Sequence, residues 1–251
     1  MGKALFIIKE LILGRIHSGP QNFLQFGRKC FLCELQTAQR LLLCEDCAQE
    51  LPWRQFHKLC YQCGMTLPYC TQNTLICGDC LKEKPSFDRV IASFDYAAPI
   101  KNIIKALKFK NVFYCAQFLA LALSQSVKPQ YAAKQLPQVL IPVPLHSQRL
   151  KERGFNQALE IAKKLSRKLA IPLDTRLCLR NKNSVPQSSL GAAQRRRQQQ
   201  GFFIDSSRNI YEHVAIIDDV MTTGTTVNSL AQILRHSGVK QIDVWVCART
   251  E

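Results

Sequence analysis

The sequence from Val214 to Thr226, VAIIDDVMTTGTT, constrains the fold more than any other stretch of the chain. An apolar run ends in two adjacent carboxylates, Asp218 and Asp219, and a short segment rich in hydroxyl groups follows. Such apolar runs are typical of buried parallel strands, and open α/β sheets bind ligands at the carboxyl ends of their strands. The stretch therefore predicts a parallel sheet in which a central strand carries the two acids at its carboxyl end.

The hydroxyl-rich segment predicts a phosphate-binding turn that opens a helix. Backbone N–H groups at a helix N-terminus, together with threonine hydroxyls, can bind a phosphate. A Walker A loop is excluded, because no lysine follows the glycine at the required position. An ordinary strand-turn-helix with solvated acids is the alternative interpretation. The candidate phosphate ligands are Thr222, Thr223, Gly224, Thr225 and Thr226.

The same stretch resembles the phosphoribosyl pyrophosphate (PRPP) signature of type I phosphoribosyltransferases. In that family, two adjacent acids bind the ribose hydroxyls and the loop after them binds the 5′-phosphate. The resemblance implies these roles for Asp218 and Asp219 and for the loop that begins at Thr222. It also implies magnesium as the ion that accompanies PRPP.

Four C-x-x-C pairs in the first 80 residues predict metal binding. A C-x-x-C turn directs two sulfurs at one ion, and two such turns complete a tetrahedral zinc site. In a reducing compartment, zinc accounts for four such pairs better than disulfides do, and an iron–sulfur cluster is a further alternative. The candidate ligands are Cys30, Cys33, Cys44, Cys47, Cys60, Cys63, Cys77 and Cys80.

Two pairings of these cysteines stay open at this point. Short loop closure favours two sequential sites, whereas a cross-braced arrangement would alternate the pairs. Both arrangements give two closed sites of four thiolates, which predicts two structural zinc ions. A module of this size buries too little apolar surface to fold without metal. Among the remaining cysteines, we expect Cys70 to be a free thiol and Cys115, Cys178 and Cys247 to be core residues.

The positive charge is concentrated in the C-terminal part of the chain. Lys and Arg total 34 against 18 Asp and Glu, so the formal net charge is +16. Residues 1–88 carry 10 basic and 8 acidic side chains, and residues 89–251 carry 24 and 10. This distribution favours a polyanionic partner, nucleic acid or a polyphosphorylated substrate, over a merely solvated basic surface.

Two stretches without acids hold the candidate pyrophosphate- and DNA-binding residues. In the first, 96–151, Lys101, Lys105 and Lys108 share one helix face. The polar middle of the second, 175–204, is expected to be a mobile loop or an antiparallel flap that closes over an anion. The candidates are Lys108, Lys110, Arg149, Arg153, Arg180, Arg195, Arg196 and Arg197.

Strand-like and helical segments alternate after residue 85, which predicts an α/β fold with a parallel sheet and helices on both faces. The apolar periodicity predicts one long helix over 147–170. Further helices are expected at 100–109, 113–126 and 227–237. Strands are expected at 89–96, 138–143, 176–179, 210–217 and 241–248.

These features together resemble the ComF family of competence-associated, phosphoribosyltransferase-like proteins. The resemblance rests on the cysteine pairs, on the segments 106–110 (ALKFK), 141–146 (IPVPLH) and 153–157 (RGFNQ), and on the loop after Asp219. It extends over 180–202, where Ser184 replaces the usual threonine. The resemblance implies a double zinc ribbon at 26–85 and a type I phosphoribosyltransferase-like domain at 86–251. It implies a role in natural transformation, the handling of incoming single-stranded DNA in the cytosol.

Aromatic side chains near the basic residues could stack on bases, as in other proteins that bind single strands. For each of them, core packing is the alternative. The candidates are Phe109, Phe113, Tyr114, Phe155, Phe202 and Phe203.

Three functions remain open from the sequence. The first is a single-stranded DNA-binding protein that retains a PRPP site. The second is an active phosphoribosyltransferase that releases pyrophosphate, with Lys108, Arg149 and Arg153 as pyrophosphate contacts and no acceptor identified. The third is a zinc-ribbon scaffold for a helicase-like or translocation protein.

We expect no membrane span and a cytoplasmic location. The early apolar run, 4–13, is short and contains Lys9 and Glu10, which is atypical of a membrane helix or a signal peptide. An amphipathic helix over 3–14 is expected instead, within an N-terminal segment of residues 1–25.

Overall fold

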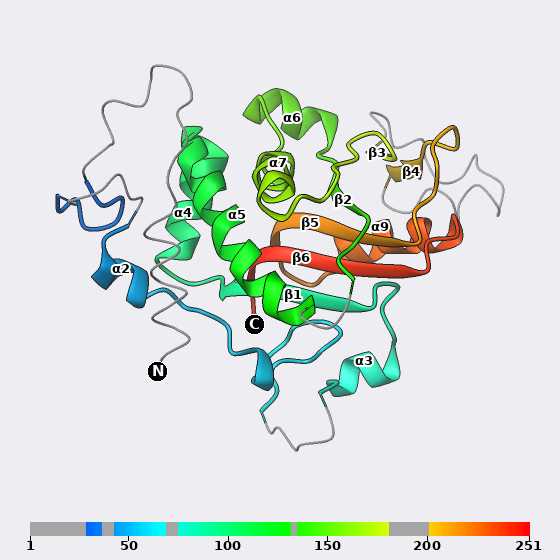
Figure 1. Ribbon diagram of the computed structural model, residues 1–251, viewed down its shortest axis with the longest axis horizontal. Helices are drawn as coiled ribbons and strands as arrows, with labels where there is room; N and C mark the ends of the chain where they lie inside the picture. The colour runs from blue at the N-terminus through cyan, green and yellow to red at the C-terminus, as the bar shows by residue number, and fades with distance from the viewer. Residues whose placement is uncertain (1–28, 37–42, 69–74, 132–134, 181–200) are drawn as a thin grey trace.

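A parallel sheet of four strands forms the centre of the described chain (Figure 1). The computed structural model describes residues 29–36, 43–68, 75–131, 135–180 and 201–251. The strand order is β1 (Arg89–Asp95), β6 (Gln241–Arg249), β5 (His213–Met221) and β2 (Val139–Pro142). All three strand pairs are parallel, so the carboxyl ends of the strands meet at one edge. The predicted α/β fold is confirmed.

Helices cover both faces of this sheet. Helices α5 (Phe113–Val127) and α7 (Gln157–Leu169) pack on one face and α9 (Thr225–His236) packs on the other (Figure 1). Because successive strand side chains point to opposite faces, Ala215 and Ile217 of β5 join the first core. Val214 and Ile216 join the second. A strand buried on both faces explains the continuous apolar run before the acids.

Three features of the sheet differ from the sequence prediction. The strand expected at 210–217 is β5, which starts later and continues to Met221, because β6 pairs with it through Asp218, Val220 and Met221. The strand expected at 176–179 is β3 (Cys178–Arg180), which lies outside the parallel sheet. It pairs antiparallel with β4 (Phe202–Ile204). These two strands flank 181–200, the middle of the expected loop or flap, which lies outside the described residues.

The prediction of one helix over 147–170 is wrong. The chain forms α6 (Ser147–Arg153) and then α7, with a break between them. Gly154 ends α6 in the left-handed region, at φ 76°, and the side chain of Asn156 accepts a hydrogen bond from the backbone N–H of Leu159 at the start of α7. A C-terminal glycine followed by an N-cap asparagine is a stop-and-start signal that outweighs apolar periodicity.

Helix α4 (Ile100–Lys110) follows β1 and precedes α5. Its buried residues include Ile103, Ile104 and Leu107, which lie on one face, and a short 3₁₀ helix (Lys128–Tyr131) follows α5. Within the residues described, no helix has the length and apolar character needed to cross a membrane. The helix expected at 3–14 lies outside them.

The cysteine-containing region packs directly against the sheet. It contains α2 (Glu45–Gln49), a 3₁₀ helix (Phe56–Lys58) and α3 (Gly78–Lys82). Leu43, Ala48 and Leu51 join the core cluster that contains α4 and α5. The rings of Trp53 and Phe94 lie 4.3 Å apart. The metal-binding region and the sheet therefore share one hydrophobic core.

A buried ionic network lies at the amino ends of the strands. The carboxylate of Asp243, fully buried, contacts Arg89 Nε at 3.2 Å and His213 Nε2 at 2.9 Å, and accepts a hydrogen bond from the Tyr131 hydroxyl. Burial beside Asp243 raises the pKa of Tyr131, which keeps this donor protonated. These groups lie at the end of the sheet opposite Asp218 and Asp219. Each of them has a partner within the network, so we interpret the network as structural.

Candidate functional site

The two predicted acids lie within β5, near its carboxyl end. Asp218 is paired with Val246 of β6. Asp219 is buried, and its backbone N–H donates a 2.8 Å hydrogen bond to Oδ1 of Asp218. Because they are adjacent in a strand, the two carboxylates leave the backbone on opposite faces. Each acid therefore has a different set of neighbours.

Lys108 reaches the second acid from α4. Its Nζ atom lies 2.7 Å from Oδ2 of Asp219, and both side chains are largely buried. Burial and the nearby charge of Asp219 raise the pKa of Asp218 to about 7. The site thus contains an ion-paired carboxylate beside one that is readily protonated, and the predicted phosphate ligand Lys108 neutralises Asp219.

The loop after β5 has the form of an anion-binding turn. Gly224, at φ 80°, occupies the N-cap position of α9, a region of φ that favours glycine. Thr223 Oγ1 lies 2.7 Å from Thr225 Oγ1 and accepts a weak hydrogen bond from the Thr225 N–H. Asp218 and residues 220–227 line a small pocket of about 40 Å³. All five predicted phosphate ligands therefore surround one pocket at a helix N-terminus, where N–H groups and the helix dipole favour an anion.

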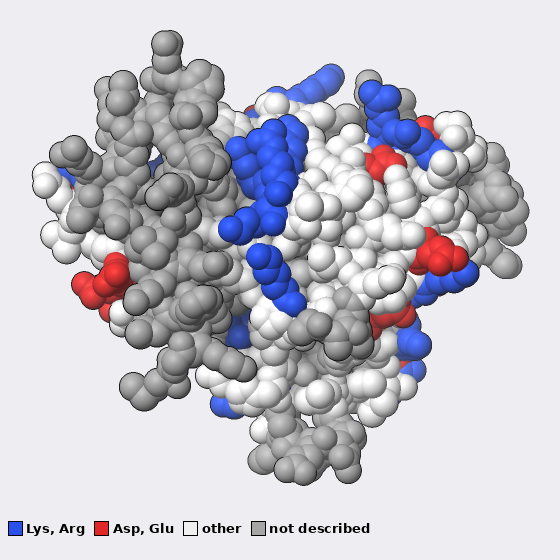
Figure 2. Space-filling model, viewed as in Figure 1, with Lys and Arg blue, Asp and Glu red and all other residues white. Residues whose placement is uncertain are grey.

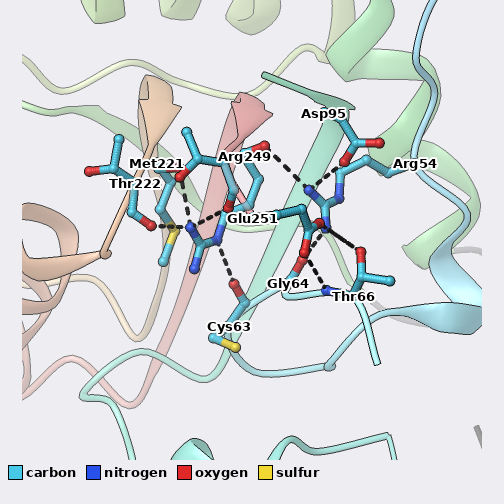
Figure 3. A network of polar contacts seen from close by, with 10 residues as sticks. Arg54, Cys63, Gly64, Thr66, Asp95, Met221, Thr222, Arg249 and Glu251 are labelled. Atoms are coloured by element: carbon cyan, nitrogen blue, oxygen red, sulfur yellow. Dashed lines mark hydrogen bonds and ion pairs between the residues drawn. The ribbon is translucent and has the colours of Figure 1, made fainter. Parts of the chain in front are cut away.

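Arg249 anchors the start of this loop and was not identified from the sequence. Its guanidinium donates hydrogen bonds to the carbonyls of Met221 and Thr222, and to the carbonyl of Cys63 in the cysteine-rich region (Figure 3). A single arginine in the last strand carries no local motif. Only the parallel pairing of β5 and β6 brings it to the loop.

Arg180 lies within the electrostatic influence of both Arg149 and Asp218. Burial lowers the pKa of Arg180, the positive charge of Arg149 lowers it further, and the negative charge of Asp218 acts in the opposite direction. Of the predicted pyrophosphate ligands, Arg180 is therefore near Asp218, and Arg149 is near Arg180. Lys110 is exposed at the end of α4. Arg195, Arg196 and Arg197 lie outside the described residues.

The RGFNQ segment forms the joint between α6 and α7. The side chain of Asn156 donates to the carbonyl of Val143, just after β2, at 3.0 Å. Arg153 donates to Gln157 at 3.1 Å and lies 5.5 Å from the ring centre of Phe109. Phe155 packs on Phe113, with ring centres 5.0 Å apart. The segment therefore fixes the loop after β2 and carries Arg153 to an aromatic surface.

The aromatic candidates separate by exposure. Phe109 and Phe113 are 68% and 46% exposed, so their rings are accessible. Phe202 is fully buried and is a core residue. Phe155, Phe203 and Tyr114 are partly buried. The exposed rings lie at the end of α4 and the start of α5, with Phe109 beside Arg153 and Phe113 beside Phe155.

The eight cysteines form two clusters of four. Within each cluster all sulfurs lie within 4.8 Å of one another, and the pairing is sequential, as loop closure favours. Cys33 and Cys44 sulfurs lie 3.7 Å apart, and those of Cys63 and Cys77 lie 3.5 Å apart. Tetrahedral zinc with bonds of about 2.3 Å places its sulfurs about 3.8 Å apart. Both clusters therefore fit a closed, structural Cys₄ zinc site.

The remaining cysteines described by the structure are core residues, as predicted. Cys115, Cys178 and Cys247 are buried, and burial raises the pKa of Cys115 to about 12. Cys70 lies outside the described residues.

Two family models match the chain. One, described as a double zinc ribbon domain, matches residues 24–81. The other, described as a phosphoribosyl transferase domain, matches residues 156–250. The first contains both cysteine clusters and the second contains the acid pair and the loop after it.

The chain is similar over most of its length to curated proteins. It is 36% identical to Competence protein F of Haemophilus influenzae, over 91% of this chain and 99% of that protein. It is 33% identical to the DNA utilization protein YhgH of Escherichia coli K12, over 88% of this chain and 96% of that protein. It is 26% identical to Competence protein ComFC of Streptococcus pneumoniae, over 88% of this chain and 100% of that protein.

Proposed function

The chain belongs to the ComF family, in which a double zinc ribbon precedes a phosphoribosyltransferase domain, and we propose that it handles single-stranded DNA in the cytosol during natural transformation. Names of the relatives, which refer to competence and to DNA utilization, support this role. In this proposal the loop after β5 binds PRPP or a related sugar phosphate. The proposal divides the chain into an N-terminal segment (1–25), a double zinc ribbon (26–85) and a phosphoribosyltransferase-like domain (86–251).

The pocket that Asp218 shares with residues 220–227 carries the proposal for the sugar phosphate. The N-terminus of α9 and the threonine hydroxyls suit a 5′-phosphate, and the carboxylate of Asp218, which lines the pocket, suits a ribose hydroxyl. Asp219 lies on the opposite face of the strand and pairs with Lys108, whereas Arg180 supplies positive charge near Asp218 for a pyrophosphate group. Magnesium would enter with PRPP and neutralise part of its charge.

The surface around Phe109 supports single-strand binding. Two exposed rings, Phe109 and Phe113, lie beside Arg153 and Lys110, which combines stacking surfaces with positive charge. Figure 2 shows Lys and Arg side chains gathered at the position of α7 on the helical face. Helix α7 alone carries four basic residues and one acid. A strand of nucleic acid could follow this face with its phosphates on the basic side chains.

Titration of an oligonucleotide at several salt concentrations tests this surface. We expect the logarithm of affinity to fall steeply with the logarithm of salt, because neutralised phosphates release counterions. Phe109→Ala and Phe113→Ala should each weaken binding by about 1–3 kcal/mol through lost stacking. Tyr61→Ala is the matched control, since this ring is 44% exposed but lies in the zinc ribbon beside the start of β1, away from the junction of α4 and α5. A flat salt dependence, or equal losses in all three variants, would contradict the proposal.

Catalytic transfer from PRPP is the second candidate function. The cations near Asp218 favour it, because they could stabilise departing pyrophosphate. Incubation with Mg²⁺, PRPP and a panel of bases and amines should release pyrophosphate if transfer occurs. PRPP binding without pyrophosphate release would support a ligand site instead.

A further inference from the structure

One buried arginine joins the second zinc ribbon to the phosphate loop. Arg249 is 5% exposed, and its Nε atom donates to the carbonyl of Cys63 at 3.1 Å. Its Nη1 atom donates to the carbonyl of Met221 at 3.3 Å and to that of Thr222. Figure 3 shows the guanidinium lying between the ribbon and the end of β5. A metal ligand and the anion-binding turn are therefore hydrogen-bonded to the same planar group.

We infer that Arg249 is a positioning residue that couples the Cys60–Cys63–Cys77–Cys80 metal site to the phosphate loop. Zinc in this site increases the affinity of the loop for phosphate groups, and a bound phosphate group slows the release of that zinc. The phosphate part of this inference rests on the proposed function, whereas the mechanical link between ribbon and loop does not.

The planarity of the peptide bond explains how Arg249 acts on the loop. In a trans peptide the carbonyl and the following N–H point in opposite directions. The carbonyls of Met221 and Thr222 point toward Arg249, so the N–H groups of Thr222 and Thr223 point away from it. The carbonyl of Met221 also accepts from the N–H of Thr250 at 3.1 Å, so the bond to Thr222 is the one through which Arg249 most directly sets the direction of an N–H group, that of Thr223, in the turn that lines the pocket.

The metal determines where the third carbonyl lies. Cys63 belongs to a C-x-x-C turn in which its sulfur is 3.5 Å from that of Cys77. Zinc holds such a turn in one conformation, because the sulfurs must occupy tetrahedral positions. When the metal leaves, the carbonyl of Cys63 is free to move and Arg249 loses one of its fixed acceptors. The guanidinium, with donors in a rigid geometry, then holds the loop less firmly.

Arg54 keeps the ribbon fixed against the sheet. It donates to the carbonyl of Gly64 at 2.7 Å, and it forms ion pairs of 2.8 Å with Asp95 and Glu251 (Figure 3). The hydroxyl of Thr66 donates to Glu251 at 2.6 Å. Arg54 also donates to the backbone carbonyl of Arg249 at 3.4 Å, and none of the bonds that the structure gives for it runs to Met221 or Thr222. It therefore provides a matched control: a buried arginine of the same network that holds the ribbon without binding the phosphate loop.

The first zinc site provides a second control. Cys30 and the nearby Leu43 and Ala48 pack into the core of α4 and α5, rather than against the start of the phosphate loop. Opening this site by Cys44→Ser removes one zinc ion while leaving the Cys63 turn and its bond to Arg249 in place.

Hydrogen exchange on the full-length, zinc-loaded chain tests the coupling. The peptide that covers 218–226 is followed in wild type, Cys77→Ser, Cys44→Ser, Arg249→Gln, Arg54→Gln and the Cys77→Ser/Arg249→Gln double variant. We expect exchange of the hydrogen-bonded amides in this peptide, such as that of Thr225, to accelerate about tenfold in Cys77→Ser and in Arg249→Gln, a typical coupling between sites. The double variant should exchange no faster than either single variant, because both changes break the same link. The two control variants should match wild type in this peptide.

Several results would overturn the inference. One is that Cys77→Ser accelerates exchange by the same factor in the wild-type and in the Arg249→Gln background. Another is that Cys44→Ser accelerates exchange as much as Cys77→Ser does, which would indicate general loosening. If Cys77→Ser does not fold, the test is the comparison of Arg249→Gln with Arg54→Gln in zinc-loaded protein. Equal exchange rates of the 218–226 peptide in these two variants would overturn the inference.

Zinc release to a chelator tests the phosphate part. We expect Mg²⁺ with PRPP to slow release of the second-site zinc about tenfold in Cys44→Ser, which holds only that ion, and to have no such effect once Arg249→Gln is added. If PRPP binds and leaves release unchanged, reciprocal coupling is wrong. If PRPP does not bind at all, the proposed function fails while the exchange experiment still decides the link.

Discussion

At the scale of single residues, the two adjacent acids of β5 differ because their neighbours differ. Asp219 has Lys108 at 2.7 Å. Burial and the negative charge of Asp219 beside it both raise the pKa of Asp218 from an ordinary value of 3.8 to about 7. Below about pH 4 its carboxyl is protonated in folded and unfolded chains alike. Between pH 4 and pH 7 only the folded chain keeps the proton, so the stability that this group contributes is lost as the pH rises.

This difference predicts a pH-dependent effect of Asp218→Asn. The substitution removes the cost of ionising a buried acid, so the free energy of unfolding of the variant should rise relative to wild type between pH 5 and pH 8. Urea unfolding at both values measures it. Asp205→Asn is the control, since hydrogen bonds from Ser207 lower the pKa of Asp205 and keep it ionised at both values. If the difference in free energy of unfolding between Asp218→Asn and wild type is the same at pH 5 and pH 8, the pKa of Asp218 is not raised.

Gly224 is the residue at which the loop least tolerates a side chain. A Cβ there would lie 2.5 Å from Cε of Met221, in a backbone region that itself costs a non-glycine residue about 1–2 kcal/mol. The Met221 methyl is the free end of a flexible side chain and can move aside, so Gly224→Ala should lower the free energy of unfolding by about this backbone cost and weaken binding of phosphate. Gly238→Ala, also at positive φ and with no atom within 4 Å of the new Cβ, should lower the free energy of unfolding in the same way but leave phosphate binding unchanged. Urea unfolding and phosphate titration measure the two effects, and equal phosphate binding by both variants would contradict a role of the Gly224 turn.

At the scale of secondary structure, the joint between α6 and α7 connects the sheet edge to the aromatic surface. Asn156 caps α7 and binds the carbonyl of Val143. Asn156→Ala should lower the free energy of unfolding by about 1–2 kcal/mol, measured by urea unfolding. Asn102→Ala, at an exposed position of α4, should change it little. Similar values for the two variants would mean that the joint contributes no more than an exposed residue.

The elements that the sequence predicted well are those with a strong local signal. Three local patterns each predict a structure by themselves: the apolar run of β5, the glycine and threonines of the loop, and the spacing of the cysteine pairs. The break at Gly154 has a local signal, a glycine followed by an N-cap asparagine, but apolar periodicity continues across it and predicts one helix. The antiparallel pairing of β3 with β4 depends on contacts distant in sequence. So does the position of Arg249, and no local pattern reports either.

At the scale of the whole molecule, the zinc ribbons and the sheet form a continuous structure. The first cysteine cluster joins the core of α4 and α5, and the second binds the end of β6 through Arg249. Metal loss should therefore lower the stability of the sheet as well as that of the ribbons.

Metal analysis tests this arrangement. Wild type should contain two zinc ions per chain, and Cys44→Ser and Cys77→Ser should contain one each. Removal of both ions by a chelator should lower the Tm of the unfolding transition of the entire chain. A single ion in wild type, or an unchanged Tm after removal, would contradict the two-site arrangement or its contribution to the fold.

Sugar-phosphate binding by the β5 loop underlies the proposed function, and calorimetric titration with PRPP and Mg²⁺ measures it. We expect a single site per chain in wild type, with binding weakened at least tenfold in Asp218→Asn/Asp219→Asn, since amides replace the charged acceptors of the ribose hydroxyls. Asp205→Asn should bind as wild type does. No binding by wild type, or equal binding by the double variant, would contradict the account.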